Sequence, residues 1–209
     1  FRNRVLVMAG DTNVLAVSSE QEKTFERGFK SSWCENTAES IRSRMGITKT
    51  DPLSPYDLAS YLEVKIINLA DVPDLSQETI EHLSSAAGNE WSAVTVHCNG
   101  LVVVVVNPSH SGPRQASDLM HELAHIIRGH KPSQVHIQGD FAIRDFDQLQ
   151  EAEADWLAGC LLLPRSALFN SAYKRESTDD AIQRFGVSKS LFTYRMNKTG
   201  VKRQLSRMF

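Results

Sequence analysis

The chain has 209 residues, of which 41% are hydrophobic and 23% are charged, and its formal net charge at pH 7 is −2. These values are typical of a soluble globular protein of ordinary domain size, and they indicate neither a nucleic-acid nor a membrane partner. The apolar runs fall short of the roughly 18 residues that a membrane-spanning helix needs.

The three cysteines, Cys34, Cys98 and Cys160, are widely separated and form no C-x-x-C pair. An odd number of scattered cysteines argues against a disulfide framework. We therefore expect a reducing compartment and predict a cytoplasmic location.

Residues 1–27 are predicted to be an N-terminal extension. An apolar run at residues 5–9 follows two basic residues, but Gly10 interrupts it too early for the hydrophobic region of a signal peptide. The stretch is typical of a short hairpin or of vector-derived sequence.

Two helices are predicted before the first strand. Residues 20–45 carry apolar side chains at helical spacing, and Gly46 follows as a stop signal. A shorter helix is expected over residues 56–62, because Ser54 can cap it and Pro55 suits its first position.

A small sheet is predicted next. Residues 64–69 and 91–97 are rich in β-favouring side chains, and residues 98–100 can turn the second strand into a third at residues 101–106. This third strand is a run of six apolar residues, which predicts burial on both faces. Residues 76–85 weakly predict a helix between the first two strands.

Residues 119–127 contain the pattern H-E-x-x-H within a run of helical periodicity. His121 and His125 are four residues apart, so a helix places their side chains roughly 5–6 Å apart on one face. A zinc ion can bind both imidazoles, and Glu122 can reach a metal-bound water without binding the metal itself. The alternative is a solvated pair of histidines, but the complete pattern on an amphipathic helix favours the metal site.

Residues 129–148 are predicted to be a polar connector, followed by a strong helix over residues 146–162. Catalytic zinc normally takes three protein ligands and a water molecule, so this helix must supply the third ligand. Glu151 and Glu153 are the candidates. Glu151 is favoured because Asp155, four residues later, could accept the free N–H of a ligand histidine. Glu153 is expected to face solvent and remains the alternative ligand.

Three motifs resemble those of the ImmA/IrrE metallopeptidases. They are HELAH at residues 121–125, Glu151-x-x-x-Asp155-x-x-Ala158, and the Leu-Leu-Leu-Pro end of the second helix at residues 161–164. The second helix of that family reads E-x-x-x-N-x-x-A and ends in LLMP. Asp155 therefore stands where the family often has Asn. The resemblance covers residues 28–200.

The resemblance implies an α+β, zincin-like fold, in which a small mixed sheet packs on the HExxH helix and further helices lie at both ends. It implies Zn²⁺ as the cofactor, with His121, His125 and Glu151 as ligands and Asp155 hydrogen-bonded to a ligand histidine. Several family members cut a helix-turn-helix repressor of stress or prophage genes, so the expected substrate is a protein of that class.

The expected reaction is hydrolysis of a peptide bond by a zinc-dependent metalloendopeptidase. Glu122 would take a proton from the zinc-bound water and deliver it to the leaving amine. The tetrahedral oxyanion needs a further donor, and Tyr173, His130 and His136 are all candidates.

The C-terminal segment offers a different function. Residues 180–195 have the pattern of a helix-turn-helix, and seven Lys or Arg residues and no Asp or Glu occur from Arg184 to the end. The chain could therefore be a DNA-binding regulator, or an antitoxin-like module with a zinc site that cuts nothing. We expect instead a peptidase domain over residues 28–173, with residues 174–209 as a basic helical segment packed on it.

Overall fold

The computed structural model describes most of the chain after residue 30. The described residues are 31–85, 91–98, 101–131, 135–138, 141–144 and 147–208; for residues 31, 97–98, 135–138 and 141–144 only the backbone is described. The hairpin predicted within residues 1–27, the first part of the helix predicted over residues 20–45, and residues 99–100 of the predicted turn lie outside them.

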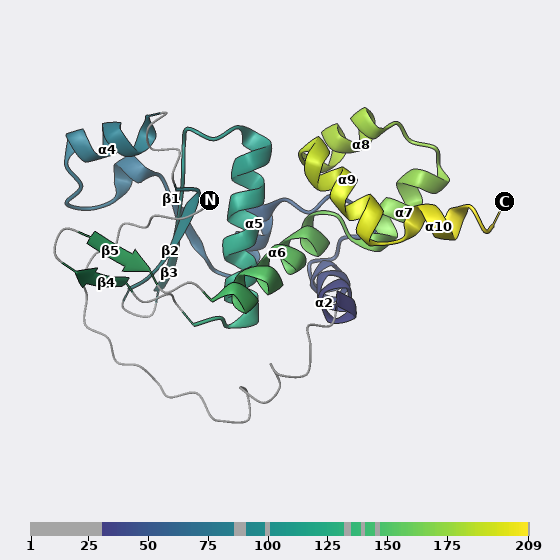
Figure 1. The fold of residues 1–209 in the computed structure, drawn as a ribbon, viewed down its shortest axis with the longest axis horizontal. Helices are drawn as coiled ribbons and strands as arrows, with labels where there is room; N and C mark the ends of the chain where they lie inside the picture. Colours follow the sequence, from purple (N-terminus) through teal and green to yellow (C-terminus); the bar gives the residue numbers. More distant parts are fainter. Residues whose placement is uncertain are drawn as a thin grey trace, which may run out of the picture.

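The described chain contains both helices and short strands, with helices alone after β5, and the predicted α+β class is confirmed (Figure 1). The elements are α2 (Ser31–Arg44), α3 (Pro55–Tyr61), β1 (Lys65–Ile67), a 3-10 helix (Leu69–Asp71), α4 (Gln77–Ser84), β2 (Ala93–Cys98), β3 (Leu101–Val106), α5 (Gly112–Arg128), β4 (Val135–Gln138), β5 (Phe141–Arg144), α6 (Gln148–Leu162), α7 (Arg165–Tyr173), α8 (Thr178–Phe185), α9 (Lys189–Lys198) and α10 (Val201–Leu205). None of the described helices is both long and apolar enough to cross a membrane.

Local sequence signals set the ends of several helices. Ser54 caps α3 by accepting hydrogen bonds from the backbone N–H groups of the next turn, and Pro55 occupies its first position, as predicted. Gly129 ends α5 with φ of 63°, a left-handed conformation that glycine adopts without a steric penalty. Asp147 caps α6 through its carboxylate, which accepts from the N–H groups of Leu149 and Gln150.

The main sheet has the strand order β1-β3-β2 and is mixed. β1 runs parallel to β3, with Ile66 opposite Val104, and β2 runs antiparallel to it. Val104 is buried in the main core, whereas Val105 is buried in a second cluster with Leu69 and Trp91 on the opposite face. The predicted burial on both faces is therefore confirmed for the second half of the strand, Val104 to Val106, whereas Leu101 at its start is exposed.

The expectation of an unstructured connector over residues 129–148 is wrong in part. Strands β4 and β5 form an antiparallel pair in this segment, with Val135 opposite Arg144. Apolar and polar residues alternate in Val-His-Ile-Gln at residues 135–138, which is a strand pattern. The polar composition of the segment as a whole concealed this alternation.

Helix α5 lies between the sheet and α6, and α6 in turn packs against α2 (Figure 1). Leu119 and Leu123 of α5 are fully buried in the main core, as are Leu157 and Leu161 of α6. The same core also includes side chains of the C-terminal helices, among them Phe192. The HExxH motif therefore lies on a helix that, with α6, is packed into the main core.

Arg195 of α9 is almost fully buried and ties the C-terminal helices to α2 and α6. Its guanidinium donates to Glu35 Oε1 at 2.6 Å and to the carbonyl oxygen of Leu163 at 3.0 and 3.1 Å. Gly159 makes room for this side chain, because a Cβ at that position would lie 3.1 Å from Arg195 Cδ. A buried charge of this kind needs its partners, so this contact holds α9 in one position.

Candidate metal centre

The HExxH motif lies in the second half of α5. The helix buries one face, formed by Leu119, Met120, Leu123 and Ala124, against the core. His121 and His125 are partly buried on the side that faces α6, with side chains 20% and 18% exposed. The predicted helical spacing therefore places both imidazoles on one accessible face.

His121, His125 and Glu151 converge on one point, and the atoms that could bind a metal lie within 4.8 Å of one another. His121 Nε2 is 2.9 Å from His125 Nε2 and 3.2 Å from Glu151 Oε2, and His125 Nε2 is 3.7 Å from Glu151 Oε1. A tetrahedral zinc site with bonds of about 2.0–2.1 Å separates its ligand atoms by about 3.3–3.4 Å. Both the donor set and its spacing fit zinc.

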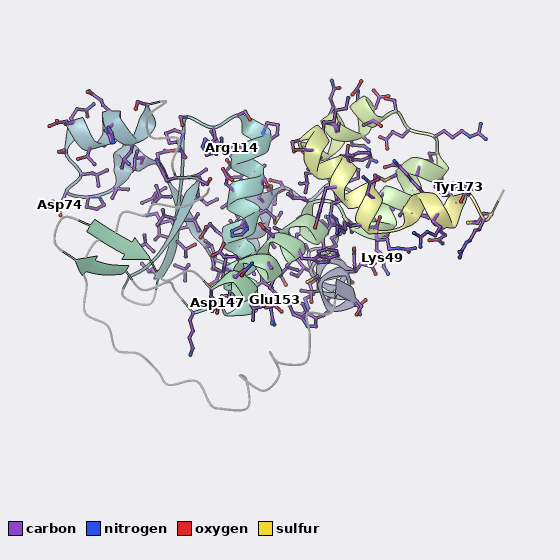
Figure 2. All side chains as sticks on the ribbon, in the orientation of Figure 1. Lys49, Asp74, Arg114, Asp147, Glu153 and Tyr173 are labelled. Atoms are coloured by element: carbon purple, nitrogen blue, oxygen red, sulfur yellow. The ribbon has the colours of Figure 1, made fainter. Side chains whose placement is uncertain are left out.

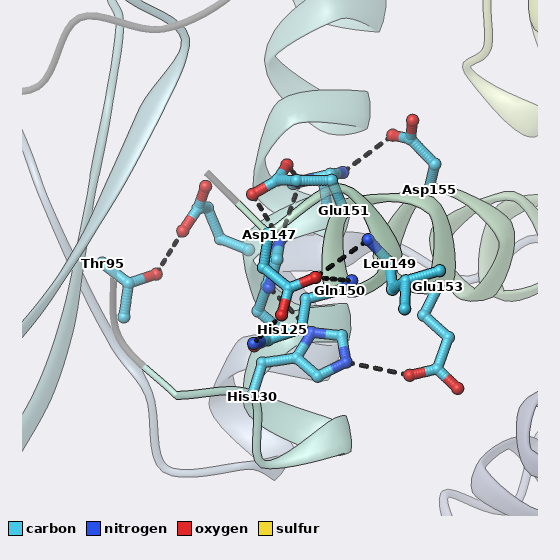
Figure 3. Close-up of polar contacts among 11 residues, drawn as sticks. Thr95, His125, His130, Asp147, Leu149, Gln150, Glu151, Glu153 and Asp155 are labelled. Atoms are coloured by element: carbon cyan, nitrogen blue, oxygen red, sulfur yellow. Dashed lines mark hydrogen bonds and ion pairs between the residues drawn. The ribbon is translucent and has the colours of Figure 1, made fainter. Parts of the chain in front are cut away.

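The two candidate glutamates of α6 point in different directions (Figure 3). Glu151 lies beside the histidines, where burial alone would raise its pKa. The neighbouring imidazoles, above all through the hydrogen bond from His121, outweigh burial and hold the pKa of Glu151 well below its usual range. Of the two glutamates, the structure therefore brings Glu151 to the site.

The expectation that Glu153 faces solvent is wrong. Its side chain is 13% exposed, and its two oxygens accept three hydrogen bonds of 2.7–3.0 Å from the Arg128 guanidinium. It also contacts His130 Nε2 at 3.1 Å. Residues two apart on a helix face different sides, but α5 flanks α6 closely enough to contact both.

Asp155 lies behind His121, as expected from its spacing to Glu151. Its Oδ1 is 2.9 Å from His121 Nδ1, on the opposite side of the ring from the converging Nε2. Burial would lower the pKa of His121, but the hydrogen bonds to Asp155 and Glu151 outweigh it and raise the pKa to about 10. The role of Asp155 in metal binding stays a prediction.

His125 has a histidine behind it rather than a carboxylate. His125 Nδ1 lies 2.9 Å from Nδ1 of His130, whose ring is almost fully buried. Burial lowers the pKa of His130, against the opposing influence of Glu153. The residues His125, His130 and Glu153 thus form a continuous row of hydrogen bonds leading away from the metal centre (Figure 3).

Glu122 points away from the two histidines and toward the sheet. Its Oε2 accepts a hydrogen bond of 2.5 Å from the Thr95 hydroxyl on β2. The two residues are 27 positions apart in the sequence. The packing of α5 against β2 therefore fixes where this carboxylate lies.

The structure places two of the three candidate oxyanion donors away from the converging ligand atoms, and it does not describe the side chain of the third. Both ring nitrogens of His130 are in hydrogen-bond contact, one with His125 and the other with Glu153. Tyr173 is exposed at the end of α7, far from Glu153 and the metal centre (Figure 2). The side chain of His136 lies outside the described residues. The structure therefore gives no support to His130 or Tyr173 as the donor.

Three features of the site were not predicted from the sequence. They are the Thr95 contact to Glu122, the place of His130 behind a ligand histidine, and the pairing of Glu153 with Arg128. A signal existed for Thr95, because Thr95 and His97 are polar residues at alternate positions of β2. Of the other two contacts, His130 follows α5 and lies five residues from His125 in the sequence, whereas Arg128 of α5 and Glu153 of α6 meet only through the packing of the two helices.

The chain was compared with known proteins. The sequence model of the Peptidase_M78 family, described as the IrrE N-terminal-like domain, matches residues 79–197. A solved structure of a Mycobacterium tuberculosis transcriptional regulator is similar, with 17% identity and a TM-score of 0.49 over 78% of this chain and 46% of that one. The chain thus spans about half the length of that neighbour, and no curated protein matches it. The match over more than half of the sequence shows that the chain belongs to the Peptidase_M78 family of IrrE N-terminal-like domains, as its HExxH and leucine–proline motifs predicted.

Proposed function

We propose that this chain is a zinc-dependent metalloendopeptidase that hydrolyses a peptide bond in a specific protein. The observation that carries the proposal is the convergence of His121, His125 and Glu151 on one point. Glu122 follows His121 in α5, and its carboxylate lies toward β2. Membership of a metallopeptidase family supports the same reaction class. The helix-turn-helix repressor as substrate is proposed from the resemblance to ImmA/IrrE peptidases.

Two nitrogens and one carboxylate oxygen form the donor set of a catalytic zinc site, which keeps a further position open. Zinc bound there would act as a Lewis acid that polarises the scissile carbonyl and makes water more acidic. Asp155 would hold the His121 ring by accepting from Nδ1, which leaves Nε2 to the metal.

Glu122 is proposed as the general base and acid. Because the Thr95 hydroxyl donates to Oε2, Oε1 is the atom left to take a proton from the attacking water. The same carboxyl group would then deliver this proton to the leaving amine nitrogen. A base in this position has no function in a purely structural metal site, so its presence favours catalysis.

The substrate is proposed to lie extended along β2. Among the described strands, β2 stands at the end of the order β1-β3-β2 and pairs only with β3. An unpaired edge can accept an extended peptide through backbone hydrogen bonds. Thr95, on this strand, contacts Glu122, so a peptide along the edge would pass close to the proposed base.

The test compares Glu122→Gln with the parent protein. The substitution keeps the shape of the side chain and removes its basicity, so zinc content and melting temperature should stay the same. Cleavage of a candidate repressor, followed by mass mapping of fragments, should fall by about 10²–10⁴-fold. Glu78→Gln, on the exposed surface of α4, is the matched control and should cut at the parental rate. A Glu122→Gln protein that cuts as fast as the parent would contradict the proposal.

DNA binding by the C-terminal helices is the weaker alternative. Helices α8 and α9 follow each other across a three-residue turn, as in a helix-turn-helix. Two of the seven basic residues are held in ion pairs, however: Arg184 with Glu176 and Arg195 with Glu35. We propose that residues 174–209 support a peptidase domain at residues 28–173. A gel shift that weakens as salt rises would favour DNA binding instead.

A further inference from the structure

The strongest unexplained feature of the site is the row of hydrogen bonds behind His125. His125 Nδ1 contacts His130 Nδ1 at 2.9 Å, and His130 Nε2 contacts Glu153 Oε2 at 3.1 Å. Neither His130 nor Glu153 is among the three residues that converge on the metal centre. Both are nearly buried, with side chains 3% and 13% exposed.

Glu153, the outermost residue of the row, determines which atom donates and which accepts in each of these hydrogen bonds. Glu153 pairs with the Arg128 guanidinium and, as a carboxylate, can only accept. His130 must therefore carry its hydrogen on Nε2. A neutral imidazole has one N–H, so His130 Nδ1 is an acceptor and the N–H of the facing contact belongs to His125 Nδ1. This leaves the lone pair of His125 on Nε2, the atom that faces His121 and Glu151.

The outer end of the row is firmly anchored in the fold. Arg128 donates to both oxygens of Glu153, and its guanidinium lies 4.5 Å from the centre of the Trp33 ring on α2. Charge-assisted and two-pronged hydrogen bonds of this kind hold a carboxylate in one orientation. By contrast, Asp155, which supports the other ligand histidine, has a side chain that is 64% exposed.

We propose that His130 and Glu153 are positioning residues, which hold His125 in the Nδ1–H tautomer and so direct its Nε2 toward the metal. This inference rests on the proposed function, because it assigns a task to residues behind the proposed zinc site. Partners behind a metal-binding histidine orient the ring, and their loss typically weakens metal affinity by about 10–100-fold. The two ligand histidines then have unequal supports, one exposed carboxylate and one buried His–Glu pair.

The proposal is tested with two variants at position 130. His130→Leu removes the acceptor for His125 Nδ1, and His130→Asn can place its amide oxygen near the same point. Zinc affinity is measured by competition with a chromophoric chelator. The tautomer of His125 is measured by NMR in the metal-free, ¹⁵N-histidine-labelled protein, which needs neither zinc nor activity.

The matched control is His110→Leu. His110 is also a nearly buried histidine paired with a carboxylate, since its Nδ1 lies 2.7 Å from Asp118 Oδ2. Neither member of this pair is a proposed metal ligand. Thermal melting of the metal-free proteins shows whether each variant folds. A general cost of removing a buried histidine would appear in both His110→Leu and His130→Leu.

We expect His130→Leu to weaken zinc binding by about 10–100-fold and to mix the tautomers of His125. His130→Asn should recover part of both, and His110→Leu should leave both unchanged. A His130→Leu protein with parental zinc affinity and an unchanged tautomer would overturn the proposal. If the parent bound no zinc, the proposed function would fail, while the tautomer in the metal-free protein would still decide this inference.

Discussion

His121 and His125 present their Nε2 atoms to the same point, but different residues hold their Nδ1 atoms. Such partners decide which nitrogen of each ring carries a proton, and therefore which nitrogen can bind a metal. Glu122 differs from both, because its hydrogen bond leads to the sheet. At the residue scale, the proposed metal ligands and the proposed general base are thus held by separate parts of the fold.

Removing the hydrogen bond from Thr95 to Glu122 is predicted to lower the cleavage rate and to leave the zinc content unchanged. Thr95→Val keeps the branched shape on β2 and removes only the hydroxyl that donates to Glu122 Oε2. One hydrogen bond to a charged group is worth about 1.5–3 kcal/mol, so cleavage should fall by about 10–150-fold. Zinc content, measured by atomic absorption, should stay the same. Thr95→Ser should keep most of the rate, and equal losses in both variants would argue against the hydroxyl.

Zinc binding is predicted to release a proton at neutral pH. The pKa of His121 in the metal-free protein is raised to about 10, so this ring carries an extra proton at pH 7. Its contribution to folding stability is fully present below its ordinary pKa and is lost as the pH rises through about 10. Zinc at Nε2 must displace that proton, so apparent affinity should rise with pH up to about pH 10.

Calorimetry in buffers with different ionisation enthalpies measures this release, and about one proton per zinc is expected at pH 7. Asp155→Asn supplies the comparison, because it removes the charge that helps to raise the pKa of His121. A heat of binding that does not depend on the buffer would show that His121 is neutral before zinc arrives.

At the scale of elements, the metal centre depends on how α5 crosses α6. His121 and His125 come from α5, and Glu151 comes from the first turn of α6. Residues four apart bring the two histidines together within one helix, but only packing between helices brings the carboxylate to them. The start of α6 is therefore as important to the site as the HExxH motif.

Removing the N-cap of α6, Asp147, is predicted to lower both the folding stability and the metal affinity modestly. Asp147 Oδ1 accepts from the N–H groups of Leu149 and Gln150 and fixes the turn that carries Glu151. Asp147→Ala should cost about 0.5–2 kcal/mol of unfolding free energy, measured with urea, and should weaken zinc binding. Asp147→Ser can still cap the helix and should lose less. If the two variants were equally affected, the capping hydrogen bonds would not be the cause.

At the scale of the whole molecule, one hydrophobic core connects the metal helices with the C-terminal helices. Its buried residues include Ala38 of α2, Leu123 of α5, Leu161 of α6 and Phe192 of α9. The second cluster, around Trp91, covers the far face of the sheet. A ligand that holds α5 to α6 would therefore stabilise the main core, to which α2 and α9 also contribute side chains.

Zinc is expected to stabilise the entire fold. A ligand that binds only the folded state adds about 4.1 kcal/mol at a thousandfold excess over its Kd. The melting temperature should therefore rise with zinc and fall again with a chelator. Glu151→Ala should remove most of this rise, whereas Glu78→Ala on α4 should keep it. A rise of equal size in Glu151→Ala would mean that zinc stabilises the protein from another site.

The sequence by itself determined the features that depend on neighbouring residues. The place of the two HExxH histidines on one helix face and the burial of the second half of the valine strand follow from periodicity within one element, and the cap at Ser54 follows from the residue types at the start of α3. The same reasoning favoured Glu151, because its spacing to Asp155 is a property of one helix. Where two patterns competed, as in residues 129–148, the overall composition hid the strands β4 and β5.

The tertiary structure alone decided which residues meet across elements. Thr95 reaches Glu122 because β2 packs beside α5, and His130 reaches Glu153 because α5 crosses α6. Sequence spacing indicates on which face of its own helix or strand a side chain lies, but not which residue of another element lies opposite it. That is decided by the packing of elements that are distant in the sequence, and for this reason Glu153 is buried at an ion pair rather than exposed to water.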